Sequence, residues 1–253
     1  MSLVLRAAVA ERDVELDLEV GDGETLAVVG PNGAGKSTAL SLISGDLRPS
    51  SGSVSLDGRI LADDRTWVPP HDRRVTTLSQ DSVLFPHLSA LGNVMFPLRQ
   101  ARGMSKAEAN DVALHFLDKV GLAAFADAYP HTLSGGMKQR VAIARALAMR
   151  PKVLLMDEPF AALDALTRER LQEDLRGSSA SRDRTSIFVT HSVDEAVFLG
   201  SRIVVLSRSP GRIALDVPVP LPRDGTDPLA VRSHPQFAAL RQIVSAELRA
   251  AAA

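Results

Sequence analysis

The sequence contains no cysteine among its 253 residues. This absence excludes a disulfide scaffold, a thiolate metal site and a cysteine nucleophile, and it fits a reducing compartment. Net charge is nearly absent as well, because 29 Lys and Arg stand against 30 Asp and Glu and leave a formal charge of −1. A protein held to nucleic acid by its electrostatic field would normally be basic, and we therefore expect no nucleic-acid partner.

The sequence also lacks a long apolar run. The longest uncharged stretch in the middle of the chain, 82–98, is interrupted by Pro86, His87, Asn93 and Pro97 and cannot form a spanning helix. The first residues lack the apolar segment and cleavage site of a secretory signal, so we expect a soluble, cytosolic protein. Apolar residues still make up 45% of the sequence, which is enough for a packed core.

Short β-type runs alternate with helical sequence along most of the chain. This alternation predicts an α/β fold with a mainly parallel sheet and a helical insertion. Strands are predicted at 14–20, 25–29, 53–56, 75–78, 153–156, 187–189 and 203–206. Helices are predicted at 38–43, 106–120 and 137–150, and the spacing of Phe237, Leu240, Ile243, Val244 and Leu248 predicts a last helix that packs on the body of the protein.

A glycine-rich segment lies between the predicted strand at 25–29 and the predicted helix at 38–43. It has the pattern of a phosphate-binding loop, in which glycine leaves the backbone N–H groups free to wrap around phosphate oxygens. In such a loop Lys36 contacts the β- and γ-phosphates, and Ser37 offers its hydroxyl to Mg²⁺. We therefore predict a nucleoside triphosphate site made by Gly30, Pro31, Asn32, Gly33, Ala34, Gly35, Lys36, Ser37 and Thr38.

Two adjacent acids, Asp157 and Glu158, follow the apolar run at 153–156. A carboxylate at the end of a buried strand can be held beside the phosphate loop, where Asp157 would orient Mg²⁺ and its waters. Glu158 would take the proton of an attacking water, a contribution typically worth about 10²–10⁴-fold in rate. Alone, the pair would indicate an acidic turn after a core strand, but beside the loop it favours a hydrolytic site.

Gln80 and His191 each follow a predicted strand. Ligands of open α/β sheets gather at the carboxyl ends of strands, so both side chains are placed to reach the γ-phosphate. A second glycine-bearing turn, Ser134-Gly135-Gly136, opens the helix at 137–150 and is a second potential anion site. It is either an ordinary capped helix or a helix tip that closes over the triphosphate held by another copy of the chain.

Together these segments resemble the ATP-binding cassette (ABC) ATPases. The resemblance runs from about Val14 to Leu206 and covers five motifs in the family's order, with 161–164 as a sixth that is similar to the loop crossing the dimer interface. It implies a P-loop NTPase core with a mainly parallel sheet, an N-terminal antiparallel β subdomain and an inserted α-helical subdomain. We accordingly expect one domain, 1–253, in which 1–85 and 151–206 form the core with its β subdomain, 86–150 the helical subdomain with the signature motif, and 207–253 a C-terminal β and helix extension.

The resemblance also implies roles for individual residues. Two ATP molecules, each with Mg²⁺, would lie between two copies arranged head to tail. Ser134, Gly135 and Gly136 would contact the γ-phosphate from the opposite copy, and Asp164 would lie in the loop that crosses the interface. In this scheme the catalytic residues are Glu158, His191, Lys36 and Gln80, and the Mg²⁺ ligands are Ser37, Gln80 and Asp157.

Two departures from the family pattern are visible. Met137 stands where the commonest signature has glutamine. No Phe, Tyr or Trp precedes Trp67, so the aromatic residue that usually stacks on adenine is missing from its expected place. We therefore expect discrimination between ATP and GTP to be loose.

Local resemblances favour an importer. The segments 67–74 and 84–89 resemble molybdate-importer cassettes, and the tail from Ser207 is similar to those of nitrate, sulfonate and taurine importers. We expect an ATPase subunit that drives uptake of an anion, either a molybdate-like oxyanion or nitrate or sulfonate, from the cytoplasmic face of the inner membrane. A soluble ABC ATPase that is not coupled to transport is the alternative.

Such a subunit needs partners besides a second copy of itself. A separate transmembrane permease is expected to dock near Gln80–Phe96, and a periplasmic or extracellular solute-binding protein would act indirectly through that permease. The apolar residues expected to supply the docking surface are Leu84, Phe85, Leu88, Val94 and Phe96.

Overall fold

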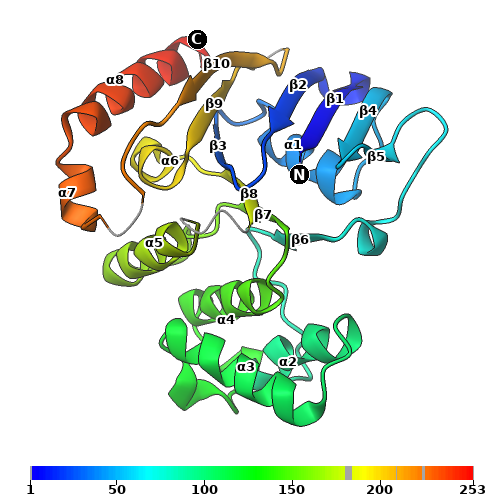
Figure 1. Ribbon diagram of the computed structural model, residues 1–253, viewed down its shortest axis with the longest axis vertical. Helices are drawn as coiled ribbons and strands as arrows, with labels where there is room; N and C mark the ends of the chain where they lie inside the picture. Colours follow the sequence, from blue (N-terminus) through cyan, green and yellow to red (C-terminus); the bar gives the residue numbers. More distant parts are fainter. Residues whose placement is uncertain (1, 180–183, 209, 224–225, 253) are drawn as a thin grey trace.

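The computed structural model describes residues 2–179, 184–208, 210–223 and 226–252 (Figure 1). Its strands form two sheets. The first is antiparallel with the order β2-β1-β4-β5, and the second has the order β10-β9-β3-β8-β7-β6. The strands of the first sheet are β1 (Leu3–Val9), β2 (Val14–Val20), β4 (Ser51–Leu56) and β5 (Arg59–Ala62). Those of the second are β3 (Thr25–Val29), β6 (Val75–Leu78), β7 (Val153–Asp157), β8 (Thr185–Val189), β9 (Arg202–Leu206) and β10 (Ile213–Pro218).

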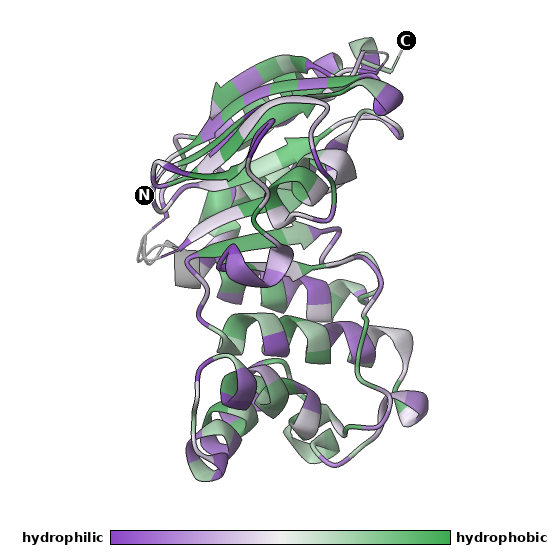
Figure 2. Ribbon diagram, turned by 90° about the vertical axis from the view of Figure 1, so that its right-hand side faces the viewer, coloured by the Kyte–Doolittle hydropathy of each residue, from purple (hydrophilic) through white to green (hydrophobic). Residues whose placement is uncertain are grey.

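The central sheet is parallel except at β10, which pairs antiparallel with β9. Strands β3 and β8 are buried along their whole length, because both faces of the sheet are covered. One face packs on α1 (Lys36–Ser44) and on the antiparallel sheet, and the other packs on α6 (Val193–Leu199) and α8 (Pro235–Ala250). Figure 2 shows strands of the central sheet in the hydrophobic colour, whereas strands of the upper sheet alternate between the two colours.

A helical lobe is inserted between β6 and β7 and lies below the sheets in Figure 1. Its three α-helices each begin at a serine cap whose hydroxyl accepts a hydrogen bond from the first turn. Their inward faces form the core of the lobe, which is continuous with one face of the central sheet. The helices are α2 (Ala90–Gln100), α3 (Lys106–Lys119) and α4 (Gly135–Ala148).

The remaining helices follow β7 and β10. Helix α5 (Ala165–Ser179) crosses below the central sheet, and α7 (Pro228–Arg232) precedes α8 at the end of the chain (Figure 1). Short 3₁₀ turns complete the described elements at Ala10–Arg12, Pro70–Asp72, Ala123–Phe125 and Pro130–Thr132. In the part of the chain that the structure describes, no helix combines the length and apolarity needed to cross a bilayer.

The α/β class, the mainly parallel sheet, the antiparallel β subdomain and the inserted helices are confirmed. Besides shifts of up to two residues at the ends of other predicted elements, three details of the sequence prediction were wrong. The first helix begins at Lys36 rather than at 38, because the phosphate loop caps it directly. On α8, Ile243 is 49% exposed and lies outside the buried stripe of Phe237, Leu240 and Val244.

The third error concerns the expected docking surface. Val94 is fully buried in the core of the helical lobe, so it supplies no apolar surface. Its position on α2 faces the neighbouring helices, whereas Phe96, two residues further along, is 41% exposed. Two residues correspond to about 200° around a helix, which explains the opposite surroundings.

Candidate functional site

The phosphate loop joins the end of β3 to the start of α1. Gly35 is the N-cap of α1 and has a φ of +90°, in the left-handed region that favours glycine. A Cβ at this position would lie 2.7 Å from Val14 Cγ2, so β2 also presses against the loop. Conformation and close approach together require glycine at Gly35.

A cleft of about 520 Å³ opens above this loop. Parallel strands end at the same edge of a sheet, and the turns after β6, β7 and β8 therefore bring polar side chains to the loop. The residues that line the cleft are Arg12, Val14, Asn32, Gly33, Gly35, Lys36, Ser37, Thr38, Gln80, Glu158 and His191.

Lys36 is 7% exposed and bends back over the loop. Its Nζ donates hydrogen bonds to the carbonyl oxygens of Gly30 and Pro31, both at 2.9 Å. Burial lowers the pKa of Lys36, while the charges of Glu158 and Asp157 oppose that shift. The loop thus fixes the position of the Lys36 ammonium group. When phosphate is bound, its oxygens would accept the hydrogen bonds that the carbonyls of Gly30 and Pro31 accept here.

Glu158 and His191 form a close pair across the cleft. The distance between His191 Nε2 and Glu158 Oε1 is 2.5 Å, and the Glu158 side chain is 19% exposed. Glu158 has a φ of +47°, which strains a residue other than glycine by about 1–3 kcal/mol. Its backbone N–H donates to the carbonyl of Val189 at 3.0 Å, so the neighbouring strand β8 maintains the strained turn.

The second glycine-bearing turn lies outside this cleft. Ser134 is the N-cap of α4, its Oγ accepts from the N–H of Met137 at 3.2 Å, and Ser134 and Gly135 are exposed. A Cβ on Gly136 would lie 3.0 Å from the carbonyl of Ala162, so this helix tip adjoins the loop that carries Asp164. Hydrogen bonds from Thr167 lower the pKa of the exposed Asp164. We call Ser134–Gly136 together with Asp164 the outer cluster.

The structure therefore divides the predicted site residues into two groups. The cleft contains most of the phosphate loop with Gln80, Glu158 and His191, and Gly30 and Pro31 join it through Lys36. Ala34 is buried beneath the loop, and Asp157 acts on Lys36 through its charge without lining the cleft. The outer cluster, Ser134, Gly135, Gly136 and Asp164, lines no part of the cleft.

Sequence reasoning gave no individual role to two residues near the site. Arg12 lines the cleft and donates from a guanidinium nitrogen to Thr38 Oγ1 at 3.2 Å. Gln139 is buried in α4, where its side chain accepts from Ser82 Oγ and donates to the carbonyl of Pro159 at 3.1 Å. Gln139 therefore connects α4 to the segments that follow Gln80 and Glu158.

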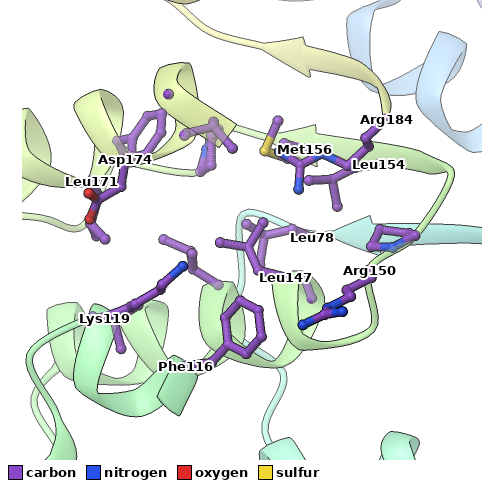
Figure 3. A pocket seen from close by; sticks show the side chains of 18 of the residues that line it. Leu78, Phe116, Lys119, Leu147, Arg150, Leu154, Met156, Leu171, Asp174 and Arg184 are labelled. Carbon is purple, nitrogen blue, oxygen red and sulfur yellow. The ribbon is translucent and has the colours of Figure 1, made fainter. Parts of the chain in front are cut away.

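A second cavity, of about 690 Å³, lies between the helical lobe and α5 (Figure 3). Phe116 and Lys119 border it from α3, Leu147 from α4, and Leu171 and Asp174 from α5. Its lining is mainly apolar and includes no part of the phosphate loop. Its surroundings therefore do not suit a triphosphate, whereas the cleft above α1 contains the predicted phosphate loop.

Comparison with known proteins decides the family. The profile described as "ABC transporter" matches residues 14–161, which is more than half of the chain. The chain belongs to the ABC transporter family. It is an ATP-binding cassette, an ATPase of the ABC type.

Several curated relatives of this ABC cassette span most of its length. A putative ATP-binding protein of Brucella abortus is 47% identical over 90% of this chain and 84% of the relative. The nitrate import ATP-binding protein NrtD of Synechocystis is 42% identical over 96% of this chain and 89% of that protein. The molybdenum import ATP-binding protein ModC of Mycobacterium tuberculosis is 46% identical over 81% of this chain and 57% of that protein.

A solved structure extends the comparison to three dimensions. The ATP-binding cassette MJ0796, in a dimeric post-hydrolysis state bound to ADP and Pi, superposes with a TM-score of 0.76. The two chains are 33% identical, and the alignment covers 87% of this chain and 99% of that one. The cassette fold is therefore shared over nearly the whole of the solved structure.

Proposed function

We propose that the chain is the ATP-hydrolysing subunit of an ABC importer that takes up an anion. The observation that carries the hydrolytic part is the Glu158–His191 pair, at 2.5 Å, in one cleft with Lys36 and the phosphate loop. Loop N–H groups and Lys36 would bind the phosphates of ATP. The names of NrtD and ModC support the import of an anion.

Glu158 and His191 have different roles in the proposed hydrolysis. A water attacks the γ-phosphorus, the bond between that phosphorus and the bridging oxygen breaks, and ADP leaves with the electron pair of that bond. Glu158 takes the proton of the water, and its strained backbone keeps the carboxylate in the cleft. His191 Nε2 orients Glu158 and, once ATP is bound, is within reach of the γ-phosphate.

Mg²⁺ fits the donors at the same edge of the sheet. Ser37, Gln80 and Asp157 offer a hydroxyl, an amide and a carboxylate oxygen, the hard ligands that Mg²⁺ prefers beside substrate phosphates. We propose these three residues as its protein ligands. Bound there, the metal supplies positive charge that neutralises the phosphate oxygens.

We further propose that two copies work head to tail. Within one chain Ser134, Gly135 and Asp164 are exposed and the outer cluster lines no part of the cleft, although a helix N-terminus is suited to bind a phosphate. In the dimer, Ser134, Gly135 and Gly136 of one copy would cover the γ-phosphate held by the other. The dimeric state described for MJ0796 supports this arrangement.

The surface proposed for the permease surrounds Phe85 and Phe96. Their ring centroids are 4.8 Å apart, both rings are more than a third exposed, and Val83 is 68% exposed. Arg145 donates to the carbonyl of Val83 at 2.8 Å and lies 5.8 Å over the Phe85 ring. The fully buried Asn93 accepts from the Phe85 N–H at 2.8 Å and donates to its carbonyl at 3.1 Å.

These contacts hold an apolar surface in a fixed shape beside Gln80. An exposed apolar patch with an ordered backbone is typical of a protein interface. We therefore propose that the permease docks within Gln80–Phe96, with Leu84 and Leu88 contributing their partly exposed surfaces. The chain would then lie peripherally on the cytoplasmic face of the inner membrane, and the solute-binding protein would meet only the permease.

Site-specific cross-linking tests the transport assignment against a soluble ATPase. Because the chain has no cysteine, Phe96→Cys introduces a single thiol for a photoactivatable cross-linker. Leu229→Cys on α7, which is 69% exposed and far from this surface in the sequence, is the matched control. We expect the label at residue 96, and not the one at 229, to capture a polytopic membrane protein from native membranes. No capture by either variant would favour the soluble alternative, and equal capture by both would reject the proposed docking surface.

We also propose that the chain is divided into three functional parts. Residues 1–85 and 151–206 would act as the nucleotide-binding core, 86–150 as the lobe that carries the signature, and 207–253 as a C-terminal extension. The choice among a molybdate-like oxyanion, nitrate and sulfonate is tested by uptake of each solute in cells that carry or lack the subunit.

A further inference from the structure

A largely buried carboxylate, Glu195, is bonded to the residue that precedes His191. Glu195 is in the first turn of α6, and its side chain is 14% exposed. Its Oε2 accepts from Thr190 Oγ1 at 2.5 Å, and the same hydroxyl accepts from the N–H of Ser192 at 3.0 Å. These two bonds fix the residues on both sides of His191.

The other oxygen of Glu195 faces α5. Oε1 accepts from Gln172 Nε2 at 3.0 Å and lies 3.9 Å from Arg168 Nε. Arg168 donates to the carbonyls of Phe160 and Leu163, at 3.3 and 3.0 Å, in the loop that follows β7. One carboxylate therefore connects the turn that contains His191 with the loop that begins at Glu158.

The surroundings of Glu195 disfavour its ionised form. Burial raises the pKa of this carboxyl, and the charge of Glu158 adds to the rise, whereas Thr190, Arg168 and Gln172 hold it down. A buried carboxylate is stabilised only when its hydrogen bonds are well made. Thr190, Gln172 and Arg168 must therefore keep the positions from which they contact the carboxylate.

One side of helix α5 makes polar contacts with α6 and with the loop after β7, and the other side borders the apolar cavity. Leu171 and Leu175 face the cavity of about 690 Å³ (Figure 3), while Arg168 and Gln172 bond toward the loop after β7 and toward α6. The polar contacts of Arg168 and Gln172 therefore hold α5 on the side away from the cavity.

The same contacts extend to the C-terminal extension. Gln172 Oε1 accepts from a guanidinium nitrogen of Arg232, the last residue of α7, at 3.1 Å. This guanidinium also lies 4.1 Å over the ring of Phe198 in α6, and its Nε is 3.9 Å from Glu169 Oε1. Arg232 therefore joins α5, α6 and α7 at one point.

We propose that Glu195 is a positioning residue for ATP hydrolysis and that Arg232, through Gln172, couples α7 to it. The inference rests on the proposed hydrolytic role of Glu158 and His191. Glu195 touches no substrate in this arrangement. It sets the relative placement of the two loops, and a displacement of α7 changes the hydrolysis rate without changing how tightly ATP binds.

Steady-state hydrolysis and calorimetric ATP binding by the full-length chain test this proposal. Glu195→Gln keeps an acceptor for Thr190 and removes the charge that faces Arg168. We expect kcat to fall about tenfold to hundredfold, because small misplacements of reacting groups have effects of this size, while KM and the Kd for ATP change by less than about threefold. Arg232→Gln should lower kcat in the same direction by a smaller factor.

The control is Arg241→Gln. Arg241 lies on α8 and pairs with Asp194 of α6 at 3.5 Å, but both side chains are about half exposed. Its loss should leave kcat unchanged. The double variant Glu195→Gln with Arg232→Gln should lose no more activity than Glu195→Gln alone, because coupled residues are not additive.

Each further outcome decides a part of the proposal. A fall in ATP affinity parallel to the fall in kcat would indicate a merely structural role for Glu195 and overturn the positioning role. Multiplicative losses in the double variant would overturn the coupling through Arg232. If Glu195→Gln does not fold, Arg232→Gln decides alone by the same split between kcat and Kd. Hydrolysis by Glu158→Gln is measured in parallel. Normal hydrolysis by that variant rejects the proposed function itself. If Glu158→Gln is inactive while Glu195→Gln is fully active, only the positioning role of Glu195 is rejected.

Discussion

The N-termini of α1 and α4 both begin with glycine-bearing turns, but they differ in what their free N–H groups face. At α1 the loop is wrapped around a cleft that already contains Lys36, Glu158 and His191. At α4 the Ser134 hydroxyl caps its own helix, and the tip lies on the surface next to the loop of Asp164. One tip thus belongs to a cleft built within the chain, whereas the other would meet its partner in the second copy of the proposed dimer.

Substitutions at the two helix ends should therefore have different effects. Changes at the α1 end should alter nucleotide binding or chemistry in every copy that carries them. Changes at the α4 end should leave the binding of ATP to an isolated chain intact and appear only in turnover.

The largest effect is expected for Glu158→Gln. Removal of the proton acceptor should lower kcat by at least about a hundredfold, since general-base contributions are of this order or more. ATP should still bind, and dimers that contain trapped ATP should accumulate in size-exclusion chromatography. Glu19→Gln, at an exposed position on β2, is the control and should hydrolyse ATP normally. Turnover by Glu158→Gln at the parental rate would remove this residue as the base.

Lys36→Ala should have the next largest effect, this time on binding. Loss of one charged donor to phosphate costs about 1.5–3 kcal/mol, which corresponds to roughly tenfold to a hundredfold in the Kd for ATP. Isothermal titration calorimetry measures this change, and Lys152→Ala at an exposed position should show none. An ATP affinity equal to that of the parent would count against the phosphate loop.

Ser134→Arg should sharpen the contrast between the two tips. The long charged side chain should prevent the outer cluster from closing over a γ-phosphate, and turnover should drop about tenfold or more. The Kd of the isolated chain for ATP should stay at the parental value, because Ser134 lines no part of the cleft. A comparable loss of ATP affinity would show that this serine acts within its own chain.

The smallest effects are expected at the glycines of the loop. Gly33→Ala introduces only backbone strain, since φ is +83° and no atom lies within 4 Å of the added Cβ, and it should cost about 1 kcal/mol of unfolding free energy. Gly35→Ala adds a contact of 2.7 Å with Val14 Cγ2 and should cost more. Urea denaturation compares the two variants, and equal losses would show that the contact with β2 is relieved without cost.

The motifs could be located from the sequence because they are local. The phosphate loop, the acids after β7 and the residues after β6 and β8 are defined by short patterns, and the parallel sheet brings them together at one edge. Strand β2 was equally clear, since its buried and exposed residues alternate without exception.

Other elements depend on contacts that no local pattern shows. Helix α5 is polar, and two of its buried residues, Gln172 and Arg176, owe their burial to bonds with α6 and the C-terminal segment. Arg12 reaches the cleft only because the turn between β1 and β2 passes over α1. Helix α6 had a usable signal in the Ser192-x-x-Glu195 capping pattern, but the role of Glu195 arises from tertiary packing.

Complementation between two inactive variants tests the central claim that each ATP site is shared by two chains. Lys36→Ala chains retain an intact outer cluster, and Ser134→Arg chains retain an intact phosphate loop. A mixed dimer therefore contains one composite site in which both halves are functional. We predict that mixing the two variants restores ATP hydrolysis well above the rate of either variant alone. If the mixture, with heterodimers verified by differential tagging, stays as inactive as its components, the sites are complete within single chains and the account is contradicted.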